Sequence, residues 1–361
     1  MSNANTILQL TSGTCVSEYL RLRPYLENSV IHTFSFGGFE GLALKGSPNT
    51  LQILESDSLI ADAQEDTIIH AFGVIKIQEQ PPKHLSFLSQ TPHYAYDHSS
   101  GSGVYAYVLD TGVNKKHREF EGRVIEGKDL TGEGFEDQHG HGTHVAGLIS
   151  SKTFGVCKNS IIVNVKTLKK DGSGSLSDVI AGIDFAANHR IEMKRPGVAN
   201  LSLGGARSSI MNAAIDAAVL SGLAVVVAAG NSNIPASAMS PASSRNVVVV
   251  GAIDYTNRIA SFSNWGRAVT VFAPGVDVCS VNANTDSPAP SCMSGTSMAS
   301  PQVAGLLAYF MGMGDDPATA VERLISTSRS AIPLLSVLVR PFTYNRLAYN
   351  NAGLPFQSSN E

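Results

Sequence analysis

GVANLSLGG at residues 197–205 is one of five short apolar runs that decide the fold of this chain. The other runs are VYAYVLD at 104–110, IIVNVKTL at 161–168, LAVVVAAGN at 223–231 and NVVVVGAID at 246–254. Two segments expected to be helical lie between them, DVIAGIDFAANHRIEMK at 178–194 and IMNAAIDAAVLSG at 210–222. Apolar strands that alternate with helices predict an α/β fold in which helices cover both faces of a mostly parallel sheet.

The carboxyl ends of these strands carry the first hint of a site. Asp110, Gly204 and Asn231 each stand at the end of a predicted strand. Ligands of such folds bind beyond the carboxyl ends of the strands, so the sequence predicts one site at one edge of the sheet. Ser175 and Asp178 have the spacing of a capping box at the start of the helix that follows them.

Length and composition limit the class of protein. The 361 residues exceed the usual span of one domain, so we expect two folded units. Hydrophobic residues make up 43% and charged residues 16%, which is typical of a globular protein with a large core. The 26 basic and 30 acidic residues argue against nucleic acid or a membrane as partner. No apolar run approaches the roughly 20 residues that span a bilayer.

A small α+β unit is predicted from about residue 30 to residue 71. IHTFSF at 31–36 alternates and is followed by a Gly-Gly turn, SPNTLQILES at 47–56 predicts a helix, and DTIIHAF at 66–72 predicts a returning strand. QEQPPKHLSFLSQTPH at 78–93 is polar and carries two prolines. We interpret that segment as a linker or an extended arm.

Four cysteines are too few for a disulfide framework. Cys279 and Cys292 flank a predicted hairpin rich in Asn, Ser and Pro. Either they pair across that hairpin or they remain small, half-buried thiols, and the sequence leaves both alternatives open.

Three motifs carry the chemistry: VLDTGV at 108–113, HGHGTHVAG at 139–147 and SGTSMASPQVAG at 294–305. A serine hydroxyl is a poor nucleophile unless a neutral imidazole takes its proton and a carboxylate orients that imidazole. The motifs offer one residue of each kind, Asp110, His141 and Ser297, in a chain order that subtilisins share. We therefore predict a catalytic triad.

At these motifs the sequence resembles the subtilase family, and within it the proteinase K-like branch. The similarity covers nearly all of 100–350 and includes NLSLGG, AAGNSN, SFSNWG and RLAYNNA. It implies a subtilisin-like three-layer fold with Asp110 as the orienting carboxylate, His141 as the general base and Ser297 as the nucleophile. His141 is chosen because it directly precedes Gly-Thr-His, whereas we expect the neighbouring His139 and His144 to be hydrogen-bonding residues.

The same resemblance assigns the oxyanion hole and the substrate-binding residues. Asn231 would donate from its side chain and Ser297 from its backbone N–H to the charge that develops on the scissile carbonyl. Taken alone, Asn231 would be interpreted as an ordinary turn residue. The substrate would lie beside two strips of backbone. The first strip is Gly172, Ser173, Gly174, Ser175 and Leu176, and the second is Ser202, Leu203, Gly204 and Gly205. The P1 side chain of the substrate would lie between the second strip and a third one, Ala228, Ala229 and Gly230. These small, uncharged walls predict broad cleavage after hydrophobic or aromatic residues.

The N-terminal region is similar to the inhibitory propeptide of subtilases. HTFSFGGFEGLALKGS at 32–47 and DAQEDTIIHA at 62–71 carry this similarity. It implies a zymogen that processes itself, with a propeptide domain at 1–76, a cleavage somewhere around 71–80 and a catalytic domain at 77–361. The alternative is a regulatory domain that stays attached.

Some positions depart from the family pattern. Lys83-His84-Leu85 replaces the usual Trp-Gly-Leu, and Gln302 stands where the helix after the serine commonly carries His. Proteinase K-like enzymes often bind calcium through a carboxylate at the position of Thr270. We therefore expect no required cofactor, assign no metal ligand, and leave a calcium site elsewhere open.

Other interpretations remain for comparison. An α/β-hydrolase esterase would need a second Gly where Ala299 stands and a different triad order. A non-catalytic binding protein on the same scaffold would have lost a triad residue. A narrow intracellular maturation protease is consistent with MSNANTILQLTSGTCVSEYL, which does not resemble a secretory signal, although the family resemblance implies secretion. We expect a monomer whose partners are protein or peptide substrates and its own propeptide.

Overall fold

The computed structural model describes residues 5–46, 57–66, 75–284 and 289–352. The chain divides into two compact units, residues 1–72 and 73–361. This division lies shortly before the expected boundary at 76/77. The helix expected at 47–56 and the strand expected at 67–72 lie outside the described residues.

The first unit is a four-stranded antiparallel sheet with the order β2-β3-β1-β4. Its elements are β1 (Thr6–Leu10), α1 (Val16–Leu22), a 3-10 helix η1 (Pro24–Ser29), β2 (Val30–Phe36), β3 (Phe39–Leu44) and β4 (Ile60–Glu65). Leu8, Tyr19 and Leu42 are fully buried in its core. The expectation that this unit starts near residue 30 was wrong, because Thr6–Leu10 supplies an interior strand.

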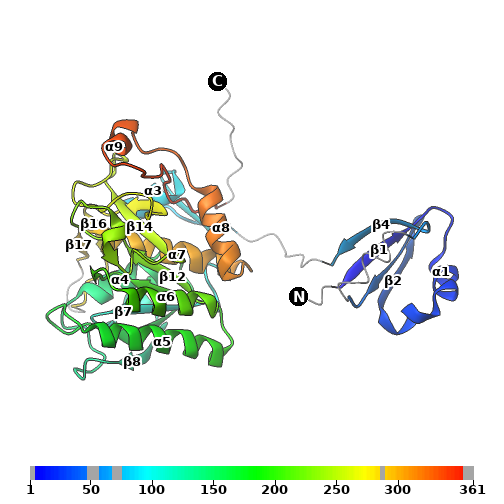
Figure 1. Cartoon of the computed structure of the whole chain (residues 1–361), viewed down its shortest axis with the longest axis horizontal. Helices are drawn as coiled ribbons and strands as arrows, with labels where there is room; N and C mark the ends of the chain where they lie inside the picture. Colours follow the sequence, from blue (N-terminus) through cyan, green and yellow to red (C-terminus); the bar gives the residue numbers. More distant parts are fainter. Residues whose placement is uncertain (1–4, 47–56, 67–74, 285–288, 353–361) are drawn as a thin grey trace. The chain divides into compact units, whose positions relative to one another are not determined.

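The second unit has the alternating order of strands and helices that the sequence predicts (Figure 1). Its strands are β5 (Ile75–Gln78), β6 (Tyr94–Asp97), β7 (Tyr105–Asp110), β8 (Val124–Asp129), β9 (Ile161–Lys166), β10 (Gly197–Leu201), β11 (Gly205–Ala206), β12 (Ala224–Ala228), β13 (Met239–Ser240), β14 (Val248–Ile253), β15 (Val271–Pro274), β16 (Val278–Ser280) and β17 (Ser291–Met293). Its helices are α3 (Lys83–Ser89), η2 (Arg118–Phe120), α4 (His141–Ser150), α5 (Leu176–Met193), α6 (Ser209–Leu220), η3 (Ala236–Ala238), α7 (Thr296–Gly312), α8 (Pro317–Thr327) and α9 (Leu334–Leu338).

The central sheet has seven strands in the order β15-β14-β12-β10-β7-β9-β8, and every pair in it is parallel. Side chains of one strand alternate between its two faces. Ala106 and Val108 of β7 therefore pack with α4 and α7, whereas Tyr107 and Leu109 pack with α5 and α6. This is the predicted three-layer α/β fold, with a buried core on each face of the sheet.

The segment 78–93 is not the linker or extended arm that its polarity suggested. Lys83–Ser89 forms α3, and Leu85 and Leu88 of that helix are fully buried in the core shared with α4 and α7. β5 and β6, on either side, pair with each other in an antiparallel ladder. The Gln78 side chain of β5 donates to the Thr153 carbonyl and accepts from Lys158.

None of the helices in the described ranges combines the length and the apolar character needed to cross a bilayer.

Two glycines before β7 have the same backbone conformation but different surroundings, so substituting each of them measures how tightly the core is packed. Gly101 and Gly103 have nearly the same positive φ, 81° and 80°. A methyl group on Gly101 would lie 2.1 Å from Cys157 Sγ, whereas the nearest atom to one on Gly103 would be Arg195 Nη1 at 3.4 Å. Both alanine variants therefore bear the same backbone strain of about 1–2 kcal/mol, and only the first adds overpacking.

We expect Gly101→Ala to lower the free energy of unfolding by about 1–3 kcal/mol more than Gly103→Ala does. The single tryptophan, Trp265, lies in the second unit, so its fluorescence during urea denaturation reports on that unit. If both variants lose the same free energy of unfolding, the contact of Gly101 with Cys157 is not tight.

Candidate active site

Asp110 is the last residue of β7, which lies between β10 and β9 in the middle of the sheet. The side chain is fully buried. Its Oδ1 atom accepts from the Thr111 backbone N–H at 2.8 Å and from His141 Nδ1 at 2.7 Å. The carboxylate therefore fixes the imidazole and uses its Nδ1 atom, which leaves Nε2 as the free ring nitrogen.

His141 is the first residue of α4, and a glycine allows that helix to approach Asp110. A methyl group on Gly142 would lie 2.2 Å from the Gly112 carbonyl oxygen, so only glycine fits there. Burial on its own would lower the pKa of His141. The charge of Asp110, the hydrogen bond to it and the more distant charge of Asp137 outweigh burial and raise this pKa above its ordinary value.

Two residues that were not predicted from the sequence, Asp137 and Lys166, hold this pair in place. Asp137 accepts from the Thr111 hydroxyl at 2.8 Å and from both the backbone N–H and the hydroxyl of Thr143. Lys166, at the end of β9, is fully buried and donates from Nζ to the carbonyls of Thr111 and Glu136 at 2.6 and 3.0 Å. Both side chains therefore fix the loop that follows Asp110, and neither belongs to a recognisable short motif.

The two histidines beside His141 have different environments. His144 is buried, and its Nε2 lies 3.1 and 3.0 Å from the carbonyls of Val278 and Ser291, so the expectation of a hydrogen-bonding residue is confirmed. Burial and the charge of His141 lower the pKa of His144 to about 4, which keeps it neutral. His139 instead lies exposed in the cleft, with its ring centroid 6.2 Å from that of His141.

Ser297 lies in the first turn of α7, where backbone N–H groups have no acceptor within the helix. Pro301 lacks the N–H that would bond the Ser297 carbonyl four residues earlier. The Ser202 hydroxyl takes its place and donates to this carbonyl at 3.0 Å. In return, the Ser297 hydroxyl donates to the Ser202 carbonyl at 3.2 Å. Ser202 follows β10, the strand beside β7, and lines the same cleft as His141.

Asn231 lies beyond the end of β12, and its orientation is fixed by Thr296. Its Oδ1 accepts from the backbone N–H and the hydroxyl of Thr296 at 2.8 and 2.9 Å. The amide Nδ2 is thereby left to donate elsewhere. A methyl group on Gly295 would lie 3.4 Å from Asn231 Nδ2 and 3.7 Å from Ser297 N. The space beside Gly295 is therefore flanked by the two donors that the sequence predicts for an oxyanion hole.

The cleft beside His141 has a volume of about 690 Å³. Two predicted strips, 172–176 and 202–205, line it. The third, Ala228 to Gly230, is not among its lining residues; Ala228 and Ala229 are buried, and the Gly230 N–H donates to the Thr296 hydroxyl at 3.1 Å. The cleft also contains side chains that the sequence did not indicate, including His139, Asp171 and Met211.

The structure confirms the hydrogen bond from the Asp178 backbone N–H to the Ser175 side chain in the capping box predicted at the start of α5. Ser175 is the residue before the helix, and its hydroxyl accepts from the Asp178 backbone N–H at 3.0 Å. Because Ser175 belongs to the strip 172–176, this cap also joins one wall of the cleft to α5.

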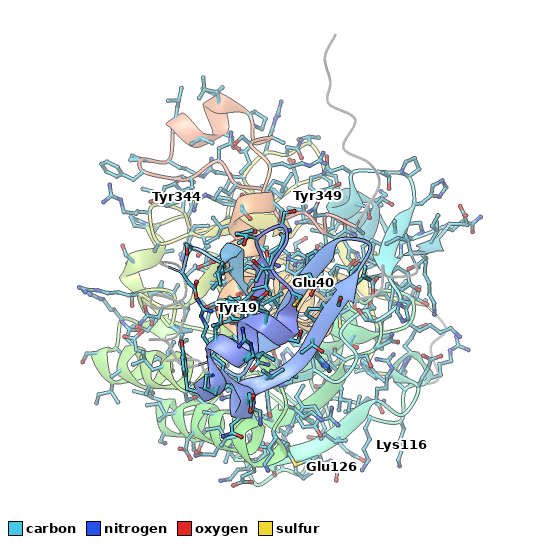
Figure 2. The ribbon with its side chains drawn as sticks, turned by 90° about the vertical axis from the view of Figure 1, so that its right-hand side faces the viewer. Tyr19, Glu40, Lys116, Glu126, Tyr344 and Tyr349 are labelled. Carbon is cyan, nitrogen blue, oxygen red and sulfur yellow. A yellow bond between two sulfur atoms is a disulfide. The ribbon has the colours of Figure 1, made fainter. Side chains whose placement is uncertain are left out.

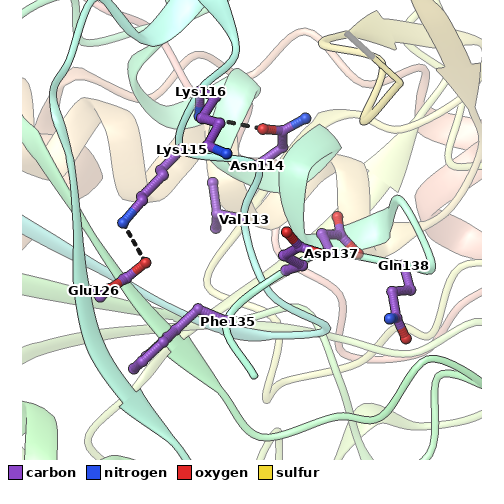
Figure 3. Close-up of a pocket in the computed structure, with 9 residues that line it drawn as sticks. Val113, Asn114, Lys115, Lys116, Glu126, Phe135, Asp137 and Gln138 are labelled. Carbon is purple, nitrogen blue, oxygen red and sulfur yellow. Dashed lines mark hydrogen bonds and ion pairs between the residues drawn. The ribbon is translucent and has the colours of Figure 1, made fainter. Parts of the chain in front are cut away.

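A second pocket, of about 510 Å³, lies behind the Asp137 loop (Figure 3). Lys115 forms an ion pair with Glu126 across it, and the Asn114 side chain accepts from the Lys116 N–H at 3.2 Å. Both signs of charge line this pocket, so its charge favours neither anions nor cations.

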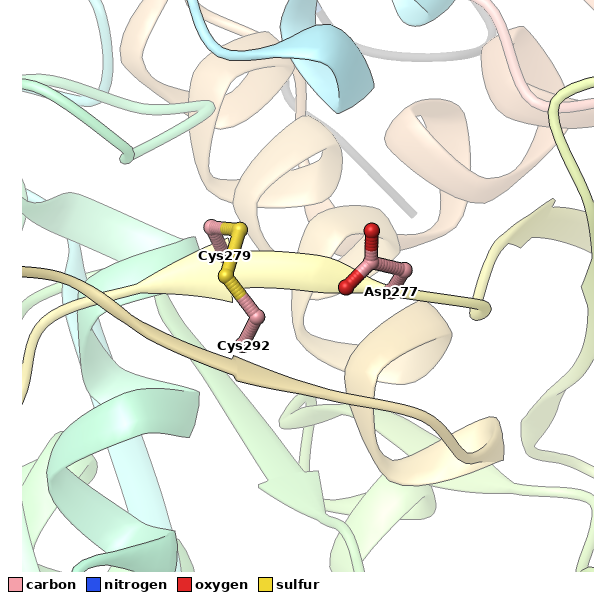
Figure 4. A group of neighbouring side chains, drawn as sticks. All are labelled: Asp277, Cys279 and Cys292. Carbon is pink, nitrogen blue, oxygen red and sulfur yellow. A yellow bond between two sulfur atoms is a disulfide. The ribbon is translucent and has the colours of Figure 1, made fainter.

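The predicted hairpin carries a disulfide between Cys279 and Cys292 (Figure 4). These residues face each other in the register of β16 and β17. Together with Asp277 they place three potential metal-ligand atoms within 4.8 Å, but two of these atoms are the bonded sulfurs. The group therefore does not offer the thiolates that a soft metal needs.

Thr270 and Gln302 are the two positions at which the family resemblance led us to expect a carboxylate and a histidine. The Thr270 hydroxyl accepts from the Val249 N–H at 3.1 Å, and the pocket beside it contains three arginines and no carboxylate among its lining residues. This chemistry does not fit a calcium ion. Gln302 is buried in α7 and donates to the carbonyls of Pro274 and Met298 at 2.7 and 2.8 Å, so it joins α7 to β15.

Comparison with known proteins gives consistent matches. The model of the subtilase family matches residues 101–334. The subtilase-type proteinase RRT12 of Saccharomyces cerevisiae is 37% identical over an alignment that covers 91% of this chain and 77% of that protein. The subtilisin-like serine protease Rho m 2.0101 of Rhodotorula mucilaginosa is 40% identical, with 84% of this chain and 92% of that protein covered.

A solved structure is also similar. The crystal structure of a cold adapted subtilisin-like serine proteinase superposes with a TM-score of 0.69 and 37% identity. It covers 75% of this chain and 98% of that chain.

The titration of His141 tests the electrostatics of this site. We expect NMR to show an imidazole pKa above the ordinary value of about 6.5. In an Asp110→Asn variant the charge is lost while burial remains, so the pKa of His141 should fall below that value. An unchanged titration would contradict the dominant role of Asp110.

Proposed function

Since this chain belongs to the subtilase family and is a subtilisin-like serine endopeptidase, we propose that Asp110, His141 and Ser297 carry out its reaction. The observation that carries the proposal is the bond of 2.7 Å from His141 Nδ1 to the buried Asp110. It orients Nε2 as the available base, in a cleft whose wall at Ser202 bonds the Ser297 hydroxyl.

The first chemical step is attack of Ser297 Oγ on the carbonyl carbon of the scissile bond. Rotation about the Cα–Cβ bond of Ser297 moves its hydroxyl from the Ser202 carbonyl toward His141 Nε2, which takes the proton. The same nitrogen then protonates the leaving amine, and an acyl-enzyme remains. A water molecule, activated by His141, hydrolyses the ester and restores the serine.

Asn231 Nδ2 and the Ser297 backbone N–H stabilise the oxyanion that forms in both steps. Thr296 supports this role, because it occupies the acceptor oxygen of Asn231 and so turns the amide nitrogen outward. Donors held in place before the reaction need no reorganisation as charge develops.

The substrate is a peptide in extended conformation that binds as an additional strand between 172–176 and 202–205. The small, uncharged residues of these strips favour a hydrophobic or aromatic P1 side chain. Asp171 adds a carboxylate at one end of the first strip, where the Ser173 N–H and hydroxyl bind it at 2.9 and 2.7 Å. A basic side chain beyond P1 would gain from this charge.

The first unit acts as a propeptide that inhibits the site until it is cut off around 71–80. Its own buried core supports folding as a separate domain before the catalytic unit. β5 begins at Ile75 and pairs within the catalytic unit, so a cut before Ile75 would leave that pairing unchanged.

A serine-directed fluorophosphonate tests the nucleophile. We expect stoichiometric labelling at Ser297 of the wild type after removal of the first unit, and none in Ser297→Ala. Ser300→Ala changes a buried serine one turn along the same helix, and it should still be labelled. If the trimmed wild type is not labelled, the proposed triad is wrong.

Substitution of Thr296 tests the oxyanion hole without removing a donor from it. Thr296→Val loses the hydroxyl that joins Asn231 to Gly230, so kcat should fall with little change in KM. Asn231→Ala should lower kcat by about 10²–10³. Thr296→Ser retains the hydroxyl and serves as the matched control, with kcat close to that of the wild type. Equal losses in the valine and serine variants would point to packing instead.

A further inference from the structure

A large pocket on the catalytic unit is not used by the proposed reaction. It has a volume of about 980 Å³ and contains the chain's single tryptophan, Trp265. The pocket lies between the segment after η3, the loop before β15 and the segment after α9. Its charged side chains are all arginines: Arg245, Arg267 and Arg346.

Within the part of the chain that the structure describes, no carboxylate pairs with the arginines of this pocket. No carboxylate is among its lining residues, and none of the three arginines takes part in an ion pair within the described ranges. Asp216 accepts from the hydroxyl of the lining residue Ser244 at 2.6 Å and keeps its negative charge, but it is not among the lining residues and forms no ion pair with the arginines in the described ranges. A site with three unpaired guanidinium groups and no lining carboxylate attracts anions and repels cations.

Aromatic rings hold two of the guanidinium groups in position. Arg267 lies over the ring of Phe342 at 5.7 Å, and Arg346 lies over that of Tyr344 at 4.4 Å. Stacking restricts these long side chains before any ligand arrives, which lowers the entropy lost on binding. Figure 2 places Tyr344 well away from Lys116 and Glu126, so this pocket is distinct from the mixed-charge pocket behind Asp137.

We propose that this pocket binds a multivalent oxyanion of the phosphate class. Guanidinium groups form paired hydrogen bonds with phosphate oxygens, and a ligand with more than one negative charge engages several arginines at once. The exposed aromatic rings of Phe342 and Tyr344 would also accommodate the base of a nucleotide, so the phosphate can be inorganic or organic. Thr270, where the family resemblance implies a calcium-binding carboxylate, also lines this pocket, and the three arginines favour a ligand of the opposite charge.

Occupancy of the pocket would stabilise the segment that carries Asn231. Trp265 forms an isolated β-bridge with Pro235, and the backbone N–H of Trp265 donates to the Ile234 carbonyl at 3.1 Å. The adjacent Asn264 accepts from the N–H groups of Ser232 and Ile234 at 3.0 and 3.1 Å. The wall of the pocket is thus bonded directly to the residues that follow Asn231.

The experiment uses the full chain with Ser297→Ala, so that self-digestion does not contribute. Pyrophosphate is titrated at constant ionic strength, and binding is followed by the fluorescence of Trp265, which lines the pocket. We expect a saturable change and, at about ten times Kd, a rise of roughly 2–4 °C in the thermal midpoint. Sodium chloride at the same ionic strength should give neither effect, and calcium chloride in a separate sample should leave the fluorescence of Trp265 unchanged.

Variants locate the site. Arg346→Gln and Arg245→Gln should each weaken pyrophosphate binding by about tenfold or more. Arg329→Gln is the matched control, because Arg329 is also half-buried and stacked on a tyrosine, Tyr349, at 3.8 Å, but does not line the pocket. Figure 2 shows Tyr349 well apart from Tyr344. Binding by Arg329→Gln should equal that of the parent.

The outcomes separate cleanly. Saturable binding that only the pocket variants weaken supports the proposal. A parallel titration with ADP identifies the source: tighter binding than pyrophosphate assigns an organic phosphate, and equal or weaker binding assigns a free one. Absence of a saturable change, an equal change of Trp265 fluorescence with calcium, or an equal loss of pyrophosphate binding in Arg329→Gln would overturn the proposal. None of these readouts depends on peptidase activity.

Discussion

The hydrogen bond between His141 and Asp110 exists because a helix comes close to the carboxyl end of a strand. β7 delivers a buried carboxylate in the middle of the sheet, and α4 begins at the imidazole. Contact between these elements is possible only because Gly142 has no side chain to strike the Gly112 carbonyl. β10 lies beside β7 and β12 lies beside β10, and these two strands are followed by Ser202 and Asn231. One parallel sheet therefore brings residues from distant parts of the chain to the same edge.

The fold was largely predictable because its signals are local. The interior strands are mostly apolar runs, as in Val248–Val250, and a covering helix such as α5 has a start signal of its own, the cap at Ser175. The polar segment around α3 was misinterpreted because Leu85 and Leu88, its buried residues, are few and lie among polar ones. The strand at Thr6–Leu10 was missed because its hydrogen-bonding partners come much later in the chain.

Some residues of the site were predictable from the sequence and others were not. Asp110, His141, Ser297 and Asn231 stand in motifs that resemble those of a known family, and the structure bonds the first two directly. Lys166 and Asp137 act through carbonyls and hydroxyls of other segments, and such contacts have no signature in the sequence. The arginines of the large pocket come from three separate segments, and only the folded chain shows that they share one cavity.

The antiparallel ladder between β5 and β6 determines what would happen to the chain end after a cut between the two units. A cut before Ile75 would separate the two units covalently, yet the new amino terminus would stay tied down by the ladder and by the bonds of Gln78 to Thr153 and Lys158. The new terminus would therefore be ordered and would be a poor site for cleavage by other proteases. Under the proposed processing, loss of the first unit would leave the pairing of β5 with β6 as it was before the cut.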